Sequence, residues 1–257
     1  MSDAYYVGAI GLGTQQRALD AIANNIANIN TGGFKRSDVR FTDVVASAAD
    51  RNTPIADLAS TPASLAGVAL DTRMMLNEQG ALQRTGAAMD IAIDGAGFIP
   101  LMGPDGQTML WRGGALKIGE NGMLANTAGM ALKAGITVPR DATALTIATD
   151  GMVTAVVPGS ADAVEIGRIE LVRVDDASAM ERIDGAIYRI ADSDVLDTGP
   201  AGQDGTGLMI QGSVERSNVA LTDEMVRMML VQRAYAANAQ IVQAADQLMG
   251  IANGLRR

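Results

Sequence analysis

Apolar residues recur at steps of three and four along the first part of the chain. The series runs through Tyr5, Gly8, Leu12, Gln15, Leu19, Ile22, Ile26 and Ile29. This spacing is typical of a helix with one apolar seam. Thr31-Gly32-Gly33 marks the end of the pattern, because glycine weakens a helix interior and suits a left-handed stop. The pattern therefore predicts a helix within residues 1–36.

The C-terminal stretch has a similar and longer pattern, which predicts a helix of about 30 residues starting near an N-cap at Thr222. Its seam runs through Val226, Leu230, Ala234, Ala237, Ile241, Ala244, Leu248, Ile251 and Leu255. A second apolar stripe lies beside it, formed by Met225, Met229, Tyr235, Val242 and Met249. An ordinary intramolecular hairpin would bury only one face of each helix, so the second stripe favours self-assembly with further copies.

The middle of the chain shows short apolar or alternating runs separated by turns that contain glycine. Strands are expected at 89–93, 145–148, 152–156 and 166–172, while residues 45–68 have the composition of an irregular linker. The expected fold class is α+β, with paired terminal helices forming a coiled coil. Its expected parts are an N-terminal core helix in 1–36, an extended linker in 37–69, a β-rich middle domain in 70–214 and a C-terminal core helix in 215–257.

Composition and charge exclude several functions. The 257 residues include no His and no Cys, so histidine bases, thiolate nucleophiles, disulfides and Cys/His zinc sites are ruled out. The net charge is −9; residues 1–36 and 217–257 each carry +1, which leaves −11 in the middle. An acidic balance argues against a nucleic-acid partner. Without a long apolar run or a secretory signal, we expect no membrane insertion and no cleaved signal peptide.

Candidate chemistry is sparse. Residues 8–13 are similar to a dinucleotide-binding loop, but they lie inside the helical seam with no preceding strand. Asp175-Asp176 and Asp192-Ser193-Asp194 could be paired carboxylates or calcium ligands, although acidic loop residues are usually solvated. Ser47 and Ser217-Asn218 have no visible base. We therefore expect no catalytic residue, no cofactor and no metal.

Four motifs, in order along the chain, resemble those of one family. Residues 23–36, Ala-Asn-Asn-Ile-Ala-Asn-Ile-Asn-Thr-Gly-Gly-Phe-Lys-Arg, resemble the N-terminal signature of bacterial flagellar rod and hook proteins. Residues 89–98 and 122–129 are similar to the strand-and-turn motifs of the family's middle region. Residues 211–235, with Glu-Arg-Ser-Asn-Val and later Gln-Arg-Ala-Tyr, are similar to its C-terminal pattern.

The resemblance implies a structural subunit and not an enzyme. Members of the family are exported unfolded through the flagellar type III apparatus and polymerise helically in the periplasm. They form the rod of the basal body, the drive shaft between motor and hook, and contact other rod, hook and ring proteins. Residues 136–151 favour the distal rod protein. The Tyr5-Tyr6-Val7-Gly8 opening favours the proximal one, and a hook subunit is less favoured because the chain is short.

The resemblance also implies which residues have structural roles. The set expected in coiled-coil pairing and assembly is Leu12, Leu19, Ile22, Asn24, Asn25, Ile26, Asn28, Ile29, Val226, Leu230, Tyr235, Ile241 and Leu248. The set expected in the family's turns is Gly33, Phe34, Lys35, Gly95, Gly97, Phe98, Ser217 and Asn218. The asparagines have two open interpretations, namely helix capping with loop entry or hydrogen bonding between subunits.

Two functions of other classes compete with this one. The first is a glycan-acting enzyme with two convergent carboxylates in the β-rich middle. The second is a monomeric adhesin or binding module whose terminal helices are ordered without partners.

Overall fold

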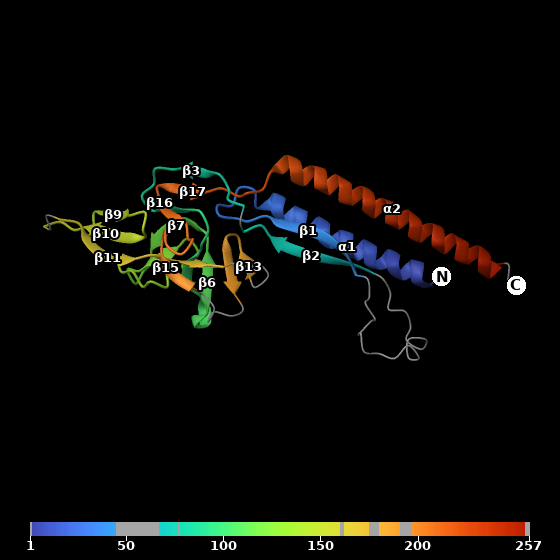
Figure 1. Cartoon of the computed structure of the whole chain (residues 1–257), viewed down its shortest axis with the longest axis horizontal. Coiled ribbons are helices and arrows are strands. Elements are labelled where there is room, and N and C mark those ends of the chain that lie inside the picture. Colours follow the sequence, from blue (N-terminus) through green and yellow to red (C-terminus); the bar gives the residue numbers. More distant parts are fainter. Residues whose placement is uncertain are drawn as a thin grey trace. The chain divides into compact units, whose positions relative to one another are not determined.

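The computed structural model describes residues 2–44, 67–76, 78–159, 162–174, 180–190 and 197–254. The chain forms two compact units, coloured along the sequence in Figure 1. Unit 1 contains the described parts of Met1–Ile26, Ser37–Arg73 and Ala220–Arg257, and unit 2 contains those of Ala27–Arg36 and Met74–Val219. Helices at both ends and a β-rich middle confirm the α+β class.

Unit 1 is built from two long helices and a two-stranded sheet. Helix α1 spans Ser2–Ala27 and helix α2 spans Leu221–Gly254, so both helix predictions are confirmed. Strands β1 (Ser37–Val44) and β2 (Gly67–Met74) pair with each other. Strand β1 and the first residues of β2, 67–69, occupy positions that we expected to belong to the linker, whereas the rest of β2 lies in the expected β-rich middle. Residues 45–66 lie outside the described residues.

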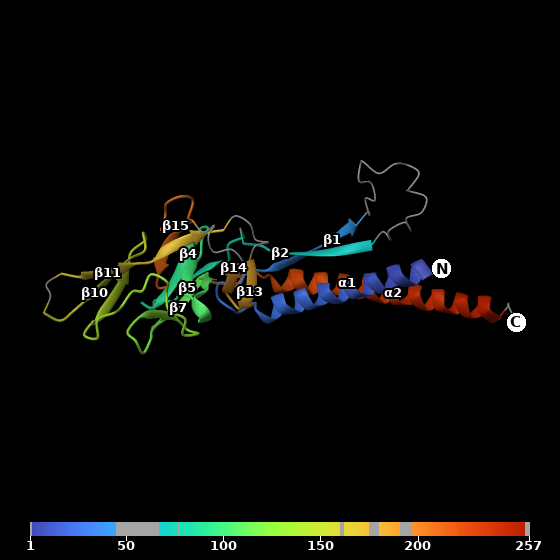
Figure 2. The same cartoon turned by 90° about the horizontal axis from the view of Figure 1, so that it is seen from below.

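The two helices pack antiparallel, side by side in Figures 1 and 2. Near one end, the amide of Asn25 donates to Glu224 at 3.2 Å. Farther along, a Cβ added to Gly8 would come within 2.6 Å of Val242 Cγ2, so glycine permits close approach. Helix α2 begins at Leu221, and Thr222 is therefore inside the helix and not its N-cap.

The face of α2 that is shielded within the chain differs from the expected one. On α1 the buried residues are Thr14, Gln15, Ala18, Ile22 and Asn25, while Leu12, Leu19 and Ile26 are half-buried. On α2 the shielded positions are Glu224, Met228, Val231, Asn238, Ala239, Val242 and Ala245. The expected coiled-coil seam is exposed instead, at Val226, Leu230, Ile241 and Leu248.

The expected pairing of seams is therefore not the packing of the single chain. Helix α2 carries apolar residues on every side, so apolar spacing alone does not single out one face. The shielded stripe includes Glu224 and Asn238. Both residues are polar, so a search for apolar positions does not select them. Gly11, opposite Asn238, leaves room for that side chain, with Nδ2 3.1 Å from the position of an added Cβ.

Unit 2 is assembled from short antiparallel sheets. One four-stranded sheet has the order β16-β4-β7-β8 and another has the order β13-β14-β6-β5. A three-stranded sheet has the order β11-β10-β9, and the pairs β12-β15 and β17-β3 complete the unit. The strands are β3 (Leu82–Arg84), β4 (Asp90–Asp94), β5 (Ile99–Met102), β6 (Thr108–Trp111), β7 (Gly113–Ile118), β8 (Leu124–Asn126), β9 (Ala144–Ile147), β10 (Met152–Val156), β11 (Val164–Arg168), β12 (Glu170–Arg173), β13 (Met180–Asp184), β14 (Ile187–Ile190), β15 (Asp197–Pro200), β16 (Leu208–Gln211) and β17 (Ser213–Glu215), with a short 3-10 helix, η1, at Pro104–Gly106.

The core of unit 2 gathers the apolar residues of several strands, among them Ile91, Ile93, Ile99, Leu101 and Trp111. The expected strand at 152–156 is β10, and the expected strands at 89–93 and 145–148 are β4 and β9. The run at 166–172 was expected as one strand, but it forms the end of β11 and most of β12. The break falls at Ile169, whose amide donates to the carbonyl of Gly151 at 2.8 Å instead of continuing a ladder.

Gly151 provides a test of this arrangement. Its φ is +87°, and an added Cβ would overlap the carbonyl oxygen of Ile169. We predict that Gly151→Ala destabilises unit 2 by about 3 kcal/mol, from the left-handed conformation and the steric overlap together. Urea unfolding followed by the fluorescence of Trp111, the single tryptophan, measures the loss.

The matched control is Gly86→Ala. Gly86 has a φ of +75°, but no atom lies within 4 Å of its added Cβ. Only the conformational cost of about 1 kcal/mol then applies. Equal losses in the two variants would show that the contact with Ile169 does not matter.

Candidate functional site

The segment that follows α1, residues 31–36, is inserted into unit 2, and we call it the plug. Gly33, Phe34 and Lys35 are all buried. The amide of Gly33 donates to the carbonyl of Glu215 at 2.8 Å. Gly33 has a φ of +70°, and an added Cβ would lie only 3.1 Å from Cβ of Ala186, so a side chain does not fit there. The N-terminal and C-terminal family motifs thus meet in one place.

Phe34 is held by a cluster of aromatic and cationic groups. The guanidinium of Arg182 lies 4.1 Å from the centre of the Phe34 ring and also donates to the carbonyl of Lys35. The amide of Lys35 donates to the hydroxyl of Tyr188 at 3.3 Å. Tyr188 packs edge-to-face on Phe98, with ring centroids 5.5 Å apart. The plug is therefore anchored by β13, β14 and the turn before β5.

Glu215 is the centre of a buried ionic network. Lys35 Nζ lies 2.7 Å from Glu215 Oε1, and Arg112 Nε lies 2.7 Å from Glu215 Oε2. The three side chains are 0%, 2% and 1% exposed for lysine, arginine and glutamate. The amide of Gly80 donates to Glu215 Oε1 at 2.9 Å, and Lys35 Nζ also donates to the carbonyl of Glu78 at 2.8 Å. Every charge in the network is hydrogen-bonded, as burial requires.

Arg112 gives a reason for the Gly95-Ala96-Gly97 turn. Its guanidinium donates to the carbonyl oxygens of Gly95 and Gly97. These glycines have φ values of +119° and +128°. Left-handed conformations turn the two carbonyls toward the cation, and glycine adopts them without strain. Arg112 also lies 5.7 Å from the centre of the Phe98 ring.

Burial and neighbouring charges shift two ionisation equilibria in this cluster. Burial, and then the adjacent Arg112, lowers the pKa of Lys35, while Glu215 acts in the opposite direction. Burial raises the pKa of Tyr188, against the opposing effect of Arg182. The tyrosine therefore remains a neutral hydroxyl that accepts the Lys35 amide.

Asn218 joins three backbone segments of unit 2. Its Oδ1 accepts from the amide of Arg36 at 2.6 Å, and its Nδ2 donates to the carbonyls of Met75 and Glu78 at 3.3 and 3.0 Å. Ser217 Oγ accepts from the amide of Val219 at 3.3 Å, which shapes the turn before α2. Ser217-Asn218 thus has a positional role that explains it without a catalytic base.

A second polar junction lies inside unit 1 and is centred on Asn25. The side-chain amide of Asn25 exchanges two hydrogen bonds with the backbone of Ser37, each 2.9 Å long, and also donates to Glu224. Arg227 Nη1 lies 2.6 Å from Asp38 Oδ1 nearby. Asn25 and Glu224 are each 1% exposed. This junction ties α1, β1 and α2 together within one chain.

The other asparagines occupy different places. Asn28 Oδ1 accepts from the hydroxyl of Thr31 at 3.1 Å, and the Thr31 amide donates to the Asn28 carbonyl, which forms the turn after α1. Asn24 and Asn30 are exposed. Asn28 thus agrees with loop entry, and Asn25 serves a third role, a bridge inside the chain, that neither interpretation anticipated. Ile29 lies beyond the end of α1 and is half-buried.

The residues expected in the family's turns lie together in the junction of unit 2. Gly33, Phe34, Lys35, Gly95, Gly97, Phe98, Ser217 and Asn218 were expected in turns, and unit 2 brings them into one neighbourhood around Glu215. Arg112, Arg182 and Tyr188 were missed because they lie far from the end motifs along the chain. The available signal was Arg112 itself, a cation directly after the apolar run Met109-Leu110-Trp111.

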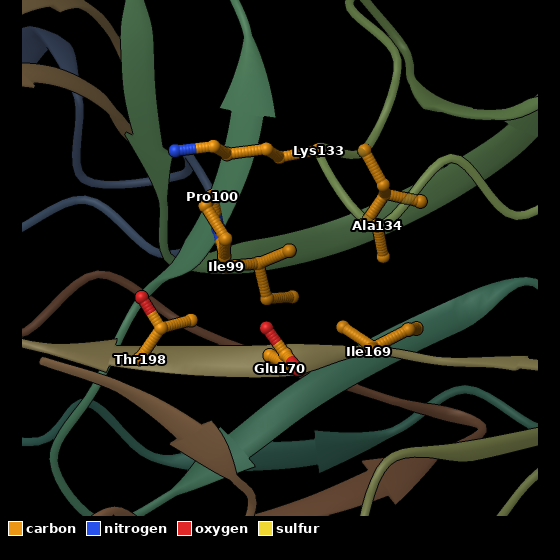
Figure 3. Close-up of a pocket in the computed structure, with 8 residues that line it drawn as sticks. Ile99, Pro100, Lys133, Ala134, Ile169, Glu170 and Thr198 are labelled. Atoms are coloured by element: carbon orange, nitrogen blue, oxygen red, sulfur yellow. The ribbon is translucent and has the colours of Figure 1, made fainter.

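The cavity in Figure 3 bears on the competing enzyme hypothesis. It has a volume of about 220 Å³ and is lined by Ile99, Pro100, Leu132, Lys133, Ala134, Ile169, Glu170 and Thr198. Glu170 is the one carboxylate among these lining residues, so the cavity lacks the acid pair of a glycosidase. Lys133 extends along Pro100, and its amine donates to Thr108 Oγ1 at 3.1 Å.

Within the described residues, no group of three or more acidic, His or Cys side chains could hold a metal ion. The acidic pairs at 175–176 and 192–194, and Ser47, lie outside the described residues. No helix in the described part of the chain is long and apolar enough to cross a membrane.

Three family models match the chain at the positions of the motifs. They are "Flagella basal body rod protein" at residues 6–35, "Flagellar hook protein FlgE/F/G D1 domain" at 92–155 and "Flagellar basal body rod FlgEFG protein C-terminal" at 210–255. The first and third contain the two segments that meet at Glu215. The chain belongs to the flagellar basal-body rod protein family and is a structural subunit of the rod.

Relatives that match the chain over nearly its whole length are named as two members of that family. The flagellar basal-body rod protein FlgG of Borreliella burgdorferi is 33% identical over 264 residues, which cover 100% of both chains. FlgG of Caulobacter vibrioides is 30% identical over 259 residues, covering 98% of this chain and 99% of its own. FlgF of the same organism is 33% identical over 256 residues, covering 96% and 95%.

Asn218 provides a test of the junction in unit 2. We predict that Asn218→Ala lowers the free energy of unfolding by about 2 kcal/mol, because the Arg36 amide loses its acceptor and the carbonyls of Met75 and Glu78 each lose one of two donors. Urea unfolding followed by Trp111 fluorescence measures the change.

The control for this prediction is Asn121→Ala. Asn121 lies in an exposed turn, where its Oδ1 accepts only from the amide of Met123 at 3.1 Å. Water replaces that partner, so the expected loss is within about 0.5 kcal/mol. A loss at Asn218 no larger than at Asn121 would remove Asn218 from the junction.

Proposed function

We propose that this chain is the distal rod subunit, which polymerises helically into the drive shaft between motor and hook and transmits torque. The relatives named FlgG, the distal rod protein, support this choice because they match the chain over its whole length. The proximal alternative is supported by the FlgF relative and by the Tyr5-Tyr6-Val7-Gly8 opening. The FlgG relatives come from several organisms and give the distal role the broader support.

The observation that carries the polymerisation proposal is the exposed apolar surface of α2. Seven large apolar side chains on this helix are more than half exposed, between 51% and 63%. They are Met225, Val226, Met229, Leu230, Ile241, Leu248 and Ile251. Soluble monomers rarely expose contiguous apolar surface of this kind, and copies of the same chain would cover it.

The geometry of such a contact supports a filament. If a stripe on one copy meets a different surface on the next, the contact is head-to-tail, and it produces an open helical filament when the rotation between copies does not close a ring. Close packing between many copies then transmits strain, which suits a shaft under torque. We assign the contacts between copies to the residues that were expected in assembly, including the exposed set Val226, Leu230, Tyr235, Ile241 and Leu248.

The proposal includes the route and the neighbours that the family resemblance implies. The chain would be exported through the flagellar type III apparatus without a cleaved signal, and would assemble in the periplasmic space as part of the basal body. Its partners would be further copies, other rod proteins, hook proteins and ring proteins. No cofactor and no catalytic residue enter this function.

Substitution of Ile26 tests the assembly role of α1. Ile26 is half-buried on the seam of α1, and a carboxylate there would be desolvated without a partner when the helices pack. We predict that Ile26→Asp abolishes polymerisation, measured by sedimentation and electron microscopy, while Trp111 fluorescence shows that unit 2 remains folded.

A matched substitution in unit 2 completes the test. Val164, in β11, is 45% exposed, and Val164→Asp places the same charge on a different surface. This variant should still polymerise. Filaments formed by Ile26→Asp would contradict the assignment of the seam.

A second test separates the rod subunit from a monomeric binding module. Because the apolar face of α2 lacks neighbours in a single copy, the terminal helices should gain order on assembly. We predict that the helical circular dichroism per residue, and the hydrogen-exchange protection of α1 and α2, increase between dilute monomer and polymer. Terminal helices that are equally protected in both states would favour the binding module.

A further inference from the structure

The Glu215 carboxylate binds donors on both of its oxygens, and the origin of these donors suggests the order in which the chain folds. Oε1 accepts from Lys35 and from the Gly80 amide, and Oε2 accepts from Arg112. These donors come from three separate segments of the chain. Lys35 and Glu215 are 180 positions apart in the sequence. A single side chain near the end of the chain therefore completes contacts with three earlier segments.

The two cations depend on that carboxylate. Lys35 and Arg112 bind the two oxygens of one group, and both are nearly inaccessible to water. Without the negative charge, two like charges would face each other in a buried site. The simplest relief is for Lys35 to leave, because it belongs to a short segment, whereas Arg112 directly follows β6 inside unit 2.

The plug and the sheets use different hydrogen bonds. Strand β17 pairs with β3, and β16 pairs with β4, through ladders that contain no plug residue. The amides of Gly33, Lys35 and Arg36 instead bond the Glu215 carbonyl, the Tyr188 hydroxyl and Asn218 Oδ1. The sheets can therefore form without the plug, but the plug has no site until residues 215–218 are in place.

We infer that residues 31–36 are a separable plug, which docks after the sheets of unit 2 have formed and only against a charged Glu215. In a chain delivered from its N-terminus, the plug would wait until almost the whole sequence had emerged. Glu215 is thus a positioning residue, because the plug can dock only after the C-terminal segment that carries Glu215 is in place. The inference concerns folding within one chain and does not depend on the proposed rod function.

The test is hydrogen exchange on the full-length chain with Glu215→Gln. Glutamine keeps the shape but has one acceptor oxygen, so its NH₂ group would face a donor. We expect protection of the Gly33, Lys35 and Arg36 amides to fall by about a hundredfold or more. Protection of β4 and β16, and the fluorescence of Trp111, should remain as in the unchanged protein.

The matched variant is Lys35→Met, which removes a cation and leaves the carboxylate. In this variant the Glu78 carbonyl still accepts from Asn218 Nδ2, and the Glu215 carboxylate still accepts from the Gly80 amide and from Arg112. We expect the plug amides to stay protected in this variant. If Lys35→Met exposed the plug as strongly as Glu215→Gln, loss of the contact and not charge balance would be the cause, and the inference would fail.

The other outcomes are equally decisive. A plug that stays protected in Glu215→Gln would overturn the inference, and so would loss of the sheets together with the plug, since the plug would then not be separable. Pulse-labelled refolding of the unchanged chain tests the order directly. The amides of β4 and β16 should gain protection before those of the plug, and simultaneous protection would contradict late docking.

Discussion

The buried carboxylate of Glu215 is the interaction that holds the plug against the sheets of unit 2. A charge this inaccessible is tolerated only when it is paired and hydrogen-bonded, and the three donors to its two oxygens come from residues 35, 80 and 112. Satisfying them fixes where the chain after α1, the loop before β3 and the segment after β6 must lie. The Gly95-Ala96-Gly97 turn then serves the same network, because its carbonyls bind the rest of the Arg112 guanidinium.

The junction at Asn25 follows the same rule in unit 1. Apolar surface on α2 is too evenly distributed to select one face, so directional bonds are needed to set the register of the helices. Asn25 supplies them, because one amide can bond the Ser37 backbone in both directions and still reach Glu224. Polar pairing thus decides which face of α2 turns inward. The expected seam, with Val226, Leu230, Ile241 and Leu248, is left exposed.

Sequence analysis predicted the elements well and the contacts between them poorly. Helices α1 and α2 and strand β10 follow from periodicity, since local spacing determines which conformation buries a stripe. The inward face of α2 did not follow, because Asn25 and Glu224 lie about 200 positions apart and no local pattern couples them. Strands β1 and β2 were not predicted either, because they pair with each other and are separated in the sequence, so no local pattern marks the pairing. The end motifs pointed to Lys35 and Asn218, but Arg112 could be placed only once the sheets were known.

Buried polar side chains and exposed apolar side chains have different roles in this protein. Lys35, Arg112, Glu215, Asn25 and Glu224 all have partners within their own chain, so these buried groups need no other copy for their bonds. Apolar contact between copies is less directional and scales with area, so it can be repeated along a filament without a unique charge pair at each step. Directional bonds therefore define the subunit, while in the proposed rod the exposed apolar side chains of α2 would join one subunit to the next.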